Sequence, residues 1–194
     1  MIPPTRNRHT TRLPGYDYTQ PGGYYVTIVT RGREPVLGAV VAGSVALSIP
    51  GVTAQKAWRD LPQHFANVRL DKYVIMPNHV HGIIMIMAGD RVTPGEMDGF
   101  RRGRSVLGEA LVIPTTDLPL RADRGHGLPE IVRAFKSFSA RRINTIQNTP
   151  GQPCWQRNYY EHIIRSEIEL RKIRQYIRNN PRQWELDTEN PHTP

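Results

Sequence analysis

The sequence predicts an α+β fold in which helices pack on a central antiparallel β-sheet. Stretches rich in β-branched and aromatic residues alternate along the chain with stretches whose apolar residues recur at helical spacing. Pro77-Asn78 separates two neighbouring strand-like stretches, and this pair is turn chemistry that favours an antiparallel hairpin. Helices with one apolar face pack naturally on such a sheet.

The expected order of elements is strand, helix, strand, strand, insertion, helix, strand, helix. We expect strands at Tyr24–Thr30, Val68–Met76, His79–Met87 and Trp155–Ile164, and helices at Thr53–Phe65, 129–146 and 166–179. Pro129 suits the first turn of the second helix, and Ser166 with Glu169 forms a capping box that opens the last one. Pro181 disfavours helical geometry at Asn180, so the last helix is expected to stop there.

The stretch 88–128 differs from the rest of the chain. Its 41 residues contain seven Gly and three Pro, six basic and six acidic residues, and no sustained period. A structureless stretch of this length is unusual inside a compact domain. We therefore expect a flexible insertion, with at most a small strand at its apolar run 110–113, within a single domain that spans 1–194. Residues 1–23 are expected to form an extended arm.

The charge points to a polyanionic partner. The formal net charge is +9 and the pI is about 10.1. Lys and Arg neutralise phosphates and release counterions, although a basic surface can also serve solubility alone. The basic excess is concentrated in the stretch 129–184. The sequence therefore predicts that nucleic acid contacts the C-terminal third.

Cys154 is the single cysteine, which excludes an internal disulfide framework and a cysteine-rich zinc site. The N-terminus lacks the apolar core of a signal peptide, and no apolar run reaches the ~18–20 residues of a membrane span. These features predict a protein of a reducing cytoplasm and not of a membrane.

Two histidines stand two residues apart in the run Met76–Gly82 (MPNHVHG). On a strand, residues at this spacing point to the same face, so His79 and His81 present two imidazoles side by side. Two neutral imidazoles can share one divalent ion. Taken alone, the pair is a weak signal and favours two partly exposed histidines that bind nothing.

The last helix carries a tyrosine on a distinctive face. Ile173, Tyr176, Ile177 and Asn180 lie on adjoining rows of one side, at spacings of three, four and seven. Each residue also has an ordinary interpretation, since tyrosine commonly packs, asparagine commonly caps a helix and an arginine stripe is commonly solvated. That stripe, on another side of the helix, consists of Arg171, Arg174 and Arg178.

Taken together, these motifs resemble the REP-associated tyrosine transposases, which are HUH enzymes with one catalytic tyrosine. The resemblance rests on the His-x-His pair, on the run Trp155–Arg165 (WQRNYYEHIIR) and on Tyr-Ile-x-x-Asn-Pro at 176–181. The opening run Arg12–Thr27 (RLPGYDYTQPGGYYVT) also looks like that of the family. The resemblance covers roughly residues 8–87 and 129–184.

The resemblance implies a ferredoxin-like HUH nuclease fold and a specific chemistry. His79, His81 and Asn180 would hold Mg²⁺ or Mn²⁺, and Tyr176 would be the nucleophile. The product would be a covalent 5′-phosphotyrosine on single-stranded or hairpin DNA from palindromic repeats, formed by a monomer or a homodimer. A bound cation would polarise the phosphate, because a phenol with a pKa near ~10 is a poor nucleophile at neutral pH.

Further residues are expected to contact DNA or to pack. The phosphate contacts are expected from Lys136, Arg141, Arg142, Arg171, Arg174 and Arg178. Tyr159 and Tyr160 are expected to pack or to touch DNA without acting as nucleophiles, and His162 is expected to be structural.

Two other functions fit parts of the pattern. A non-catalytic binder of DNA hairpins would keep the fold without the chemistry, although Tyr176, His79 and His81 are all present. A replication initiator or a relaxase would share the HUH pair, but such enzymes usually need a larger chain. Metal-dependent nicking of single-stranded oligonucleotides separates the first alternative from the enzyme.

Overall fold

The computed structural model describes residues 13–88, 126–187 and 189–190 of the chain. Its centre is a four-stranded antiparallel sheet with the strand order β4-β5-β1-β6. The strands are β1 (Gly22–Val29), β4 (Val68–Ile75), β5 (His79–Ile86) and β6 (Tyr160–Ile164). β4 and β5 form the hairpin that the turn at Pro77-Asn78 predicts. The predicted fold class is confirmed.

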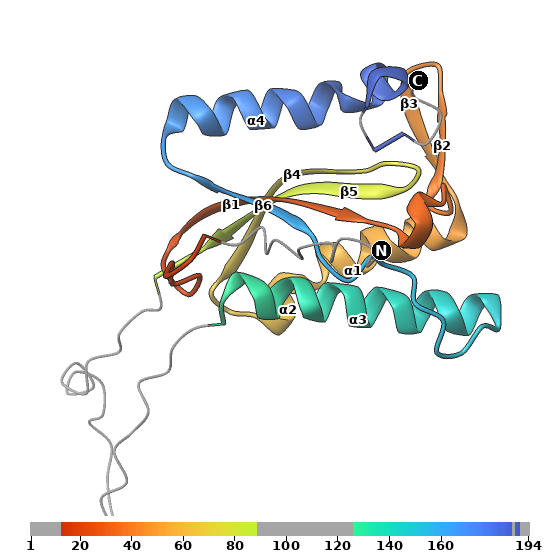
Figure 1. Cartoon of the computed structure of the whole chain (residues 1–194), viewed down its shortest axis with the longest axis horizontal. Coiled ribbons are helices and arrows are strands. Elements are labelled where there is room, and N and C mark those ends of the chain that lie inside the picture. The colour runs from red at the N-terminus through yellow and green to blue at the C-terminus, as the bar shows by residue number, and fades with distance from the viewer. Residues whose placement is uncertain (1–12, 89–125, 188, 191–194) are drawn as a thin grey trace, which may run out of the picture.

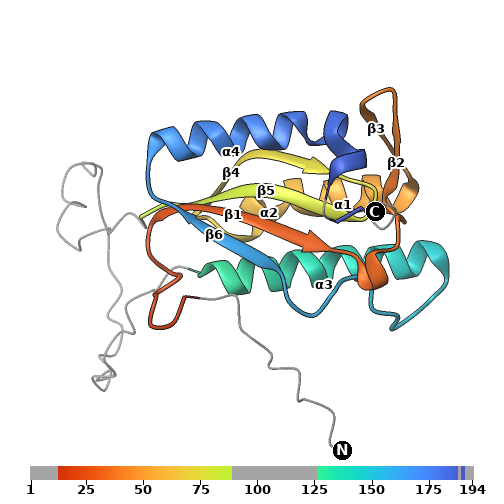
Figure 2. The ribbon, with the colours of Figure 1, turned by 45° about the horizontal axis from the view of Figure 1, so that its top comes forward.

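Helices cover both faces of this sheet (Figure 1). One face is covered by α1 (Ile49–Arg59), α2 (Leu61–His64) and α3 (Leu128–Gln147). The other carries α4 (Glu167–Asn179), which continues into the 3₁₀ helix η2 (Asn180–Leu186). Figure 2 shows α4 over the strands and α3 beneath them. A short 3₁₀ turn, η1 (Arg31–Arg33), follows β1.

The alternation of side chains along the strands builds two apolar clusters of unequal size. Tyr24, Val26 and Ile28 of β1 belong to the larger cluster, which the sheet shares with α1, α2 and α3. The smaller cluster lies beneath α4 and consists of Tyr25, Ile83, Leu170 and Ile177. Because the smaller cluster covers only part of its face, polar side chains of β1 and β5 can lie beneath the C-terminal end of α4.

Gly82 lets the strand that carries the two histidines lie directly against α1. A Cβ at this position would stand 2.3 Å from Cζ2 of the Trp58 ring, which no real pair of atoms tolerates. Trp58 itself is fully buried. The glycine in the run MPNHVHG therefore serves packing on the face opposite to the histidines.

The region after β1 differs from the prediction. In place of one helix at 53–65 there are two, since α1 begins at Ile49 and ends before Asp60, where α2 starts a new turn with Pro62. Ser48 caps α1 by accepting a hydrogen bond from the Gly51 N–H at 3.1 Å. Proline at the start of a helix is compatible with the free N–H positions of the first turn.

A second sheet, the hairpin of β2 (Gly38–Val41) and β3 (Ser44–Leu47), was not predicted. Its turn residues Ala42 and Gly43 both have positive φ angles, 49° and 71°. Such a turn normally carries Asn or Asp with Gly, so alanine in the first position hides the signal. The strands are also only four residues long.

Two further element boundaries differ from those predicted from the sequence. The expected strand Trp155–Ile164 is β6 only from Tyr160, while Trp155 makes an isolated bridge to Thr30. The expectation that Pro181 ends helical geometry at Asn180 is wrong, because Asn180 has helical φ and ψ angles of −54° and −41°. Pro181 instead opens η2, so the chain keeps turning past the end of α4.

The two ends of the expected insertion lie side by side. The backbone N–H of Met87 donates to the carbonyl of Asn67, and the Asn67 side chain donates to the carbonyl of His126 at 3.1 Å. Residues 89–125 of the expected insertion, which include the run 110–113, lie outside the described residues. Residues 1–12 of the expected arm lie outside them as well. No helix in the described ranges is both long and apolar enough to cross a membrane.

Candidate functional site

Strand β5 places His79 and His81 next to each other beneath the C-terminal end of α4. Their ring centroids are 4.3 Å apart. β5 is an inner strand, paired on both sides with β1 and β4, so the two side chains stand on a rigid base. Both are buried, at 0% and 3% exposure, which corrects the interpretation of two partly exposed histidines. Buried imidazoles need partners, and those partners reveal their orientation.

Asn78 determines which nitrogen of His79 faces the site. The Asn78 Nδ2 donates to the backbone carbonyls of Arg33 (3.0 Å) and Glu189 (2.6 Å). Its Oδ1 therefore faces His79 Nδ1 at 2.8 Å and accepts a hydrogen bond from it. The Nε2 of His79 then keeps its lone pair, and it is buried without a hydrogen-bond partner among the described residues. An unpaired buried nitrogen of this kind fits a metal ligand.

The Nδ1 of His81 is held by two hydroxyl groups from β1. Tyr25 Oη lies 2.7 Å from it and Thr27 Oγ1 lies 2.9 Å from it. Both hydroxyls can accept the Nδ1 proton, which again leaves the Nε2 lone pair for the site. β1 thus orients the second histidine, just as the turn before β5 orients the first.

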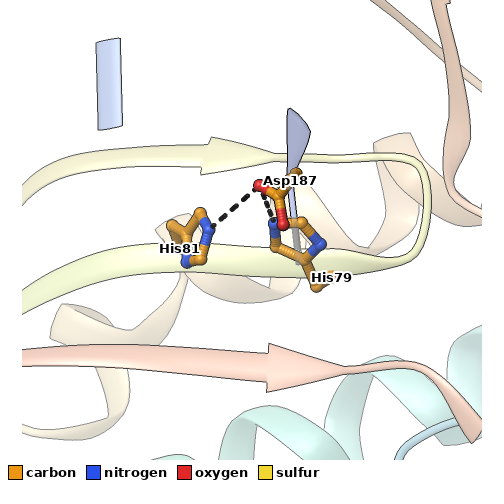
Figure 3. A group of neighbouring side chains, drawn as sticks. All are labelled: His79, His81 and Asp187. Carbon is orange, nitrogen blue, oxygen red and sulfur yellow. Dashed lines mark ion pairs between the residues drawn. The ribbon is translucent and has the colours of Figure 1, made fainter. Parts of the chain in front are cut away.

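Asp187 supplies a third group, which the sequence did not reveal. Figure 3 shows its carboxylate beside both imidazoles. The Oδ2 atom lies 3.9 Å from His79 Nε2 and 4.0 Å from His81 Nε2. The ligand atoms of the three residues all lie within 4.8 Å of one another, a spacing that could hold a metal ion. Asp187 directly follows η2, a helix that Pro181 seemed to exclude. In the sequence, no motif distinguishes Asp187 from the other acidic residues of the C-terminal tail.

Helix α4 brings Tyr176 to the same group, and the first residue of η2 brings Asn180. The Tyr176 hydroxyl is 3.4 Å from His81 Nε2. Asn180 Nδ2 donates to Asp187 Oδ2 at 2.6 Å and to the Tyr176 hydroxyl at 3.3 Å. The Oδ1 of Asn180 is buried and has no partner among the described residues. The tyrosine ring remains 43% exposed, so one side of the site opens to solvent.

The electrostatics suit a cation. Burial, and after it the neighbouring His81, lower the pKa of His79 to about 3, so its imidazole is neutral at pH 7. Burial acts to raise the pKa of Asp187, but the neighbouring His81 and the hydrogen bonds from the Glu189 N–H and Asn180 outweigh it and hold that pKa well below its usual value. His79 and Asp187 therefore present a neutral imidazole and a carboxylate, the protonation states that metal binding requires.

The nucleophile candidate is not activated by these residues alone. Burial, and next the charge of Asp187, raise the pKa of Tyr176 above its usual value. The phenol therefore keeps its proton at neutral pH. A cation in the site would reverse the sign of the local field and favour the phenolate.

Helix α3, which carries three of the predicted DNA-contacting residues, lies on the face of the sheet opposite to α4 (Figure 1). Lys136 donates to the backbone carbonyls of Gln156 and Asn158, each at 3.0 Å, and burial lowers its pKa to about 8. Arg142 pairs with Asp60 at 3.0 Å. Arg141 is exposed. The first two are thus engaged in holding the fold.

The predicted cations of α4 differ from one another. Arg174 forms a bidentate pair with Asp71 of β4, with its Nε at 3.0 Å from Oδ1 and its Nη2 at 2.6 Å from Oδ2. Arg171 and Arg178 are exposed and have no ion pair within the described residues. These two can reach a phosphate without breaking an internal contact.

The remaining residues singled out from the sequence lie around the site. Tyr160 is half exposed, and its ring centroid is 6.2 Å from that of Tyr25. The ring of Tyr159 lies 5.3 Å from the Lys136 ammonium, away from the histidines. His162 pairs with Glu169 at 2.6 Å. His162 is therefore outside the candidate metal group, in line with the structural role expected for it.

Comparison with known proteins finds a related sequence and a similar solved structure. The chain is 36% identical over 181 residues to an uncharacterized protein of Haemophilus influenzae, covering 93% of this chain and 92% of the relative. No protein-family model matches the chain. A solved REP-associated tyrosine transposase bound to a REP hairpin superposes with a TM-score of 0.50 at 18% identity, over 89% of this chain and 74% of that one. The likeness confirms the predicted resemblance at the level of the fold.

Proposed function

This chain belongs to the same protein family as the Haemophilus influenzae protein, and we propose that it is a metal-dependent, single-stranded DNA nuclease and strand transferase of the HUH single-tyrosine class. The observation that carries the proposal is the position of the Tyr176 hydroxyl, 3.4 Å from His81 Nε2 and hydrogen-bonded to Asn180. A tyrosine that served only to pack against the sheet would not require a histidine and an asparagine beside its hydroxyl. The shared fold with a REP-associated tyrosine transposase supports it.

The residues present fit a divalent cation. His79 Nε2 and Asn180 Oδ1 are buried atoms without partners among the described residues, and Asp187 adds a carboxylate beside them. We assign His79 and His81 as ligands, with Asp187 and Asn180 completing the set. Mixed imidazole and oxygen donors suit Mn²⁺ and Mg²⁺, and imidazoles also accept Zn²⁺ or Ni²⁺. When bound, the cation polarises the scissile phosphate and neutralises charge on the leaving oxygen.

Tyr176 performs the bond exchange. Its hydroxyl loses a proton to solvent water, which the exposed side of the ring allows, and its oxygen attacks phosphorus. The bond between phosphorus and the 3′-oxygen breaks, and that oxygen takes up a proton and leaves as a free 3′-OH. The 5′ end remains attached to Tyr176 as a phosphotyrosine. A 3′-OH can later attack the same phosphorus and release Tyr176, which rejoins or transfers the strand.

The substrate follows from the solved relative, which is bound to a REP hairpin. We propose that this chain also acts on hairpin DNA from palindromic repeats, in the nucleoid, as a monomer or homodimer. Exposed Arg171 and Arg178 on α4, and Arg141 on α3, are the cations available for phosphates. The other three predicted cations already have partners within the protein and would have to release them before binding a phosphate. They are Lys136, Arg142 and Arg174.

Divalent-dependent nicking tests the proposal against a non-catalytic hairpin binder. A labelled hairpin oligonucleotide with single-stranded flanks is incubated with the protein in Mn²⁺, in Mg²⁺ and in EDTA. We expect a nicked product and a protein-linked fragment with either metal and none in EDTA. Binding without nicking in any metal would instead establish the non-catalytic binder, and nicking in EDTA would refute the metal site.

A further inference from the structure

A groove of about 730 Å³ lies beside the C-terminal end of α4. Its walls are the edge strand β4, the β2–β3 hairpin and the junction of α4 with η2. Figure 1 shows the hairpin standing beside this end of α4. Arg178 follows Tyr176 by two residues and so lies roughly 200° around the helix from it. The groove and the candidate active site therefore share one wall, the end of α4.

The groove carries a net positive charge. Lys72, Arg178 and Arg182 line it, all three are exposed, and none has an ion pair within the described part of the chain. Asp71 is the single acidic residue among those that line it, and its carboxylate is already bound by Arg174. Unpaired cations that converge on a hollow from a strand and a helix end suit a chain of phosphates.

Apolar side chains also line the groove. Val45, Leu47 and Tyr73 contribute partly buried side chains to it. An unpaired base can place its flat face against such side chains while its phosphate meets the cations. Stacking of the paired bases in a duplex hides that face, so cations beside apolar side chains favour a single strand.

A peptide strand added to the sheet fits less well. β4 is an edge strand, but a register shift between Leu70 and Tyr73 interrupts its ladder. Bulges and charged side chains at an edge are the usual means by which proteins discourage strand addition. The Lys72 side chain stands within this irregular segment, so charge rather than backbone pairing dominates the edge.

We propose that this groove binds the phosphate backbone of a single-stranded segment of the DNA substrate, through Lys72, Arg178 and Arg182. This proposal rests on the proposed function for the identity of the substrate. The groove gives the DNA a second binding site beside the end of α4, separate from the position at which Tyr176 attacks. It would therefore determine affinity for single-stranded flanks and leave the bond exchange itself unchanged.

The test compares two charge-matched double variants, Arg178→Gln with Arg182→Gln and Arg59→Gln with Arg133→Gln. Arg59 and Arg133 are exposed residues of α1 and α3, the layer on the other face of the sheet. Binding of a fluorescein-labelled single-stranded oligonucleotide is measured by anisotropy in EDTA, over a range of salt concentrations. Loss of two phosphate contacts should reduce the slope of log affinity against log salt by about 1.4 and weaken binding about 25-fold at 0.1 M salt.

Lys72→Gln alone should reduce the slope by about 0.7. The double variant of the far face should bind like the wild type, and a duplex of the same sequence should compete poorly. Equal losses in both double variants, an unchanged slope in the groove variant, or no binding by the wild type would overturn the proposal. Because this assay needs no cleavage, it stands even if no phosphotyrosine forms.

Discussion

At the scale of single residues, the candidate site depends on the side chains that orient its two histidines. Asn78 orients His79, and Tyr25 with Thr27 orients His81, so that both Nε2 atoms face Asp187. Partners of this kind fix the tautomer and direction of a metal-binding imidazole. The sequence places the histidines on one face but is silent on these partners, because pairing between β1 and β5 decides them.

Tyr25→Phe tests the orientation of His81. Removing one hydroxyl leaves Nδ1 with Thr27 alone, so we expect the affinity for Mn²⁺ to fall about tenfold, as is usual for the loss of such a partner. Titration calorimetry of the protein without DNA measures this directly. Tyr24→Phe is the matched control, since the Tyr24 hydroxyl donates to the Gln20 carbonyl on the other face of the sheet. Equal affinities in both variants would rule out the orienting role of Tyr25.

His79→Ala should cost stability as well as activity. The side chain is completely buried and hydrogen-bonded to Asn78, so its removal leaves an unpaired Asn78 Oδ1. We expect the free energy of unfolding to fall by about 1–3 kcal/mol, together with complete loss of nicking. Urea denaturation measures the first effect. An unchanged midpoint would show that the imidazole does not contribute to the fold.

At the scale of elements, α4 is positioned by its two ends and one flank. Ser166 accepts a hydrogen bond from the Glu169 N–H at 3.2 Å, which confirms the predicted N-cap, while the Glu169 carboxylate reaches back to the Arg165 N–H. At the other end, the continuation into η2 carries Asp187 to the histidines. Arg174 ties the flank to β4.

Asp71→Asn tests this ion pair through the pH dependence of the protein's stability. The hydrogen bond from Arg174 is the main reason that the pKa of Asp71 lies below its usual value. A lowered pKa in the folded state means that the pair stabilises the protein above the unfolded pKa of ~3.9 and that this stabilisation is lost as pH falls through the folded pKa. We expect the variant to be about 1 kcal/mol less stable at pH 7, because the pair is only partly buried.

The difference between wild type and Asp71→Asn should therefore shrink as the pH is lowered below about 4. Urea denaturation at a series of pH values gives this curve. Glu34→Gln, a change at an exposed carboxylate, serves as the control and should show no such dependence. A difference that stays constant down to low pH would mean that the ion pair does not link α4 to β4.

At the scale of the whole molecule, the sequence predicts the sheet and its covering helices better than it predicts the hairpin and the C-terminal tail that complete the fold. The apolar alternation of β1 and β5 and the spacing on α3 and α4 reflect burial, which local patterns record. The β2–β3 hairpin and η2 were missed because their backbone turns at Ala42 and Pro181 contradict the usual preferences of those residues. Asp187 was missed with them, since its role exists only after the tail folds back.

Removal of residues 89–125 tests the division of the chain into a core and an insertion. Asn67 holds both Met87 and His126, so the ends to be joined are already close. We expect a short Gly/Ser linker in place of the segment to leave the thermal midpoint within a few degrees, because loop closure depends weakly on length. Circular dichroism during heating measures it. Loss of cooperative unfolding would show that the segment belongs to the core.

The central claim is that Tyr176 is the nucleophile. The most direct measurement is a denaturing gel of a labelled hairpin oligonucleotide incubated with Mn²⁺ and either wild type, Tyr176→Phe or Tyr160→Phe. Tyr176→Phe removes one oxygen and keeps the ring, so it should fold and bind DNA but form no covalent protein–DNA adduct. Wild type and Tyr160→Phe should both form it. An adduct that persists in Tyr176→Phe would contradict the account.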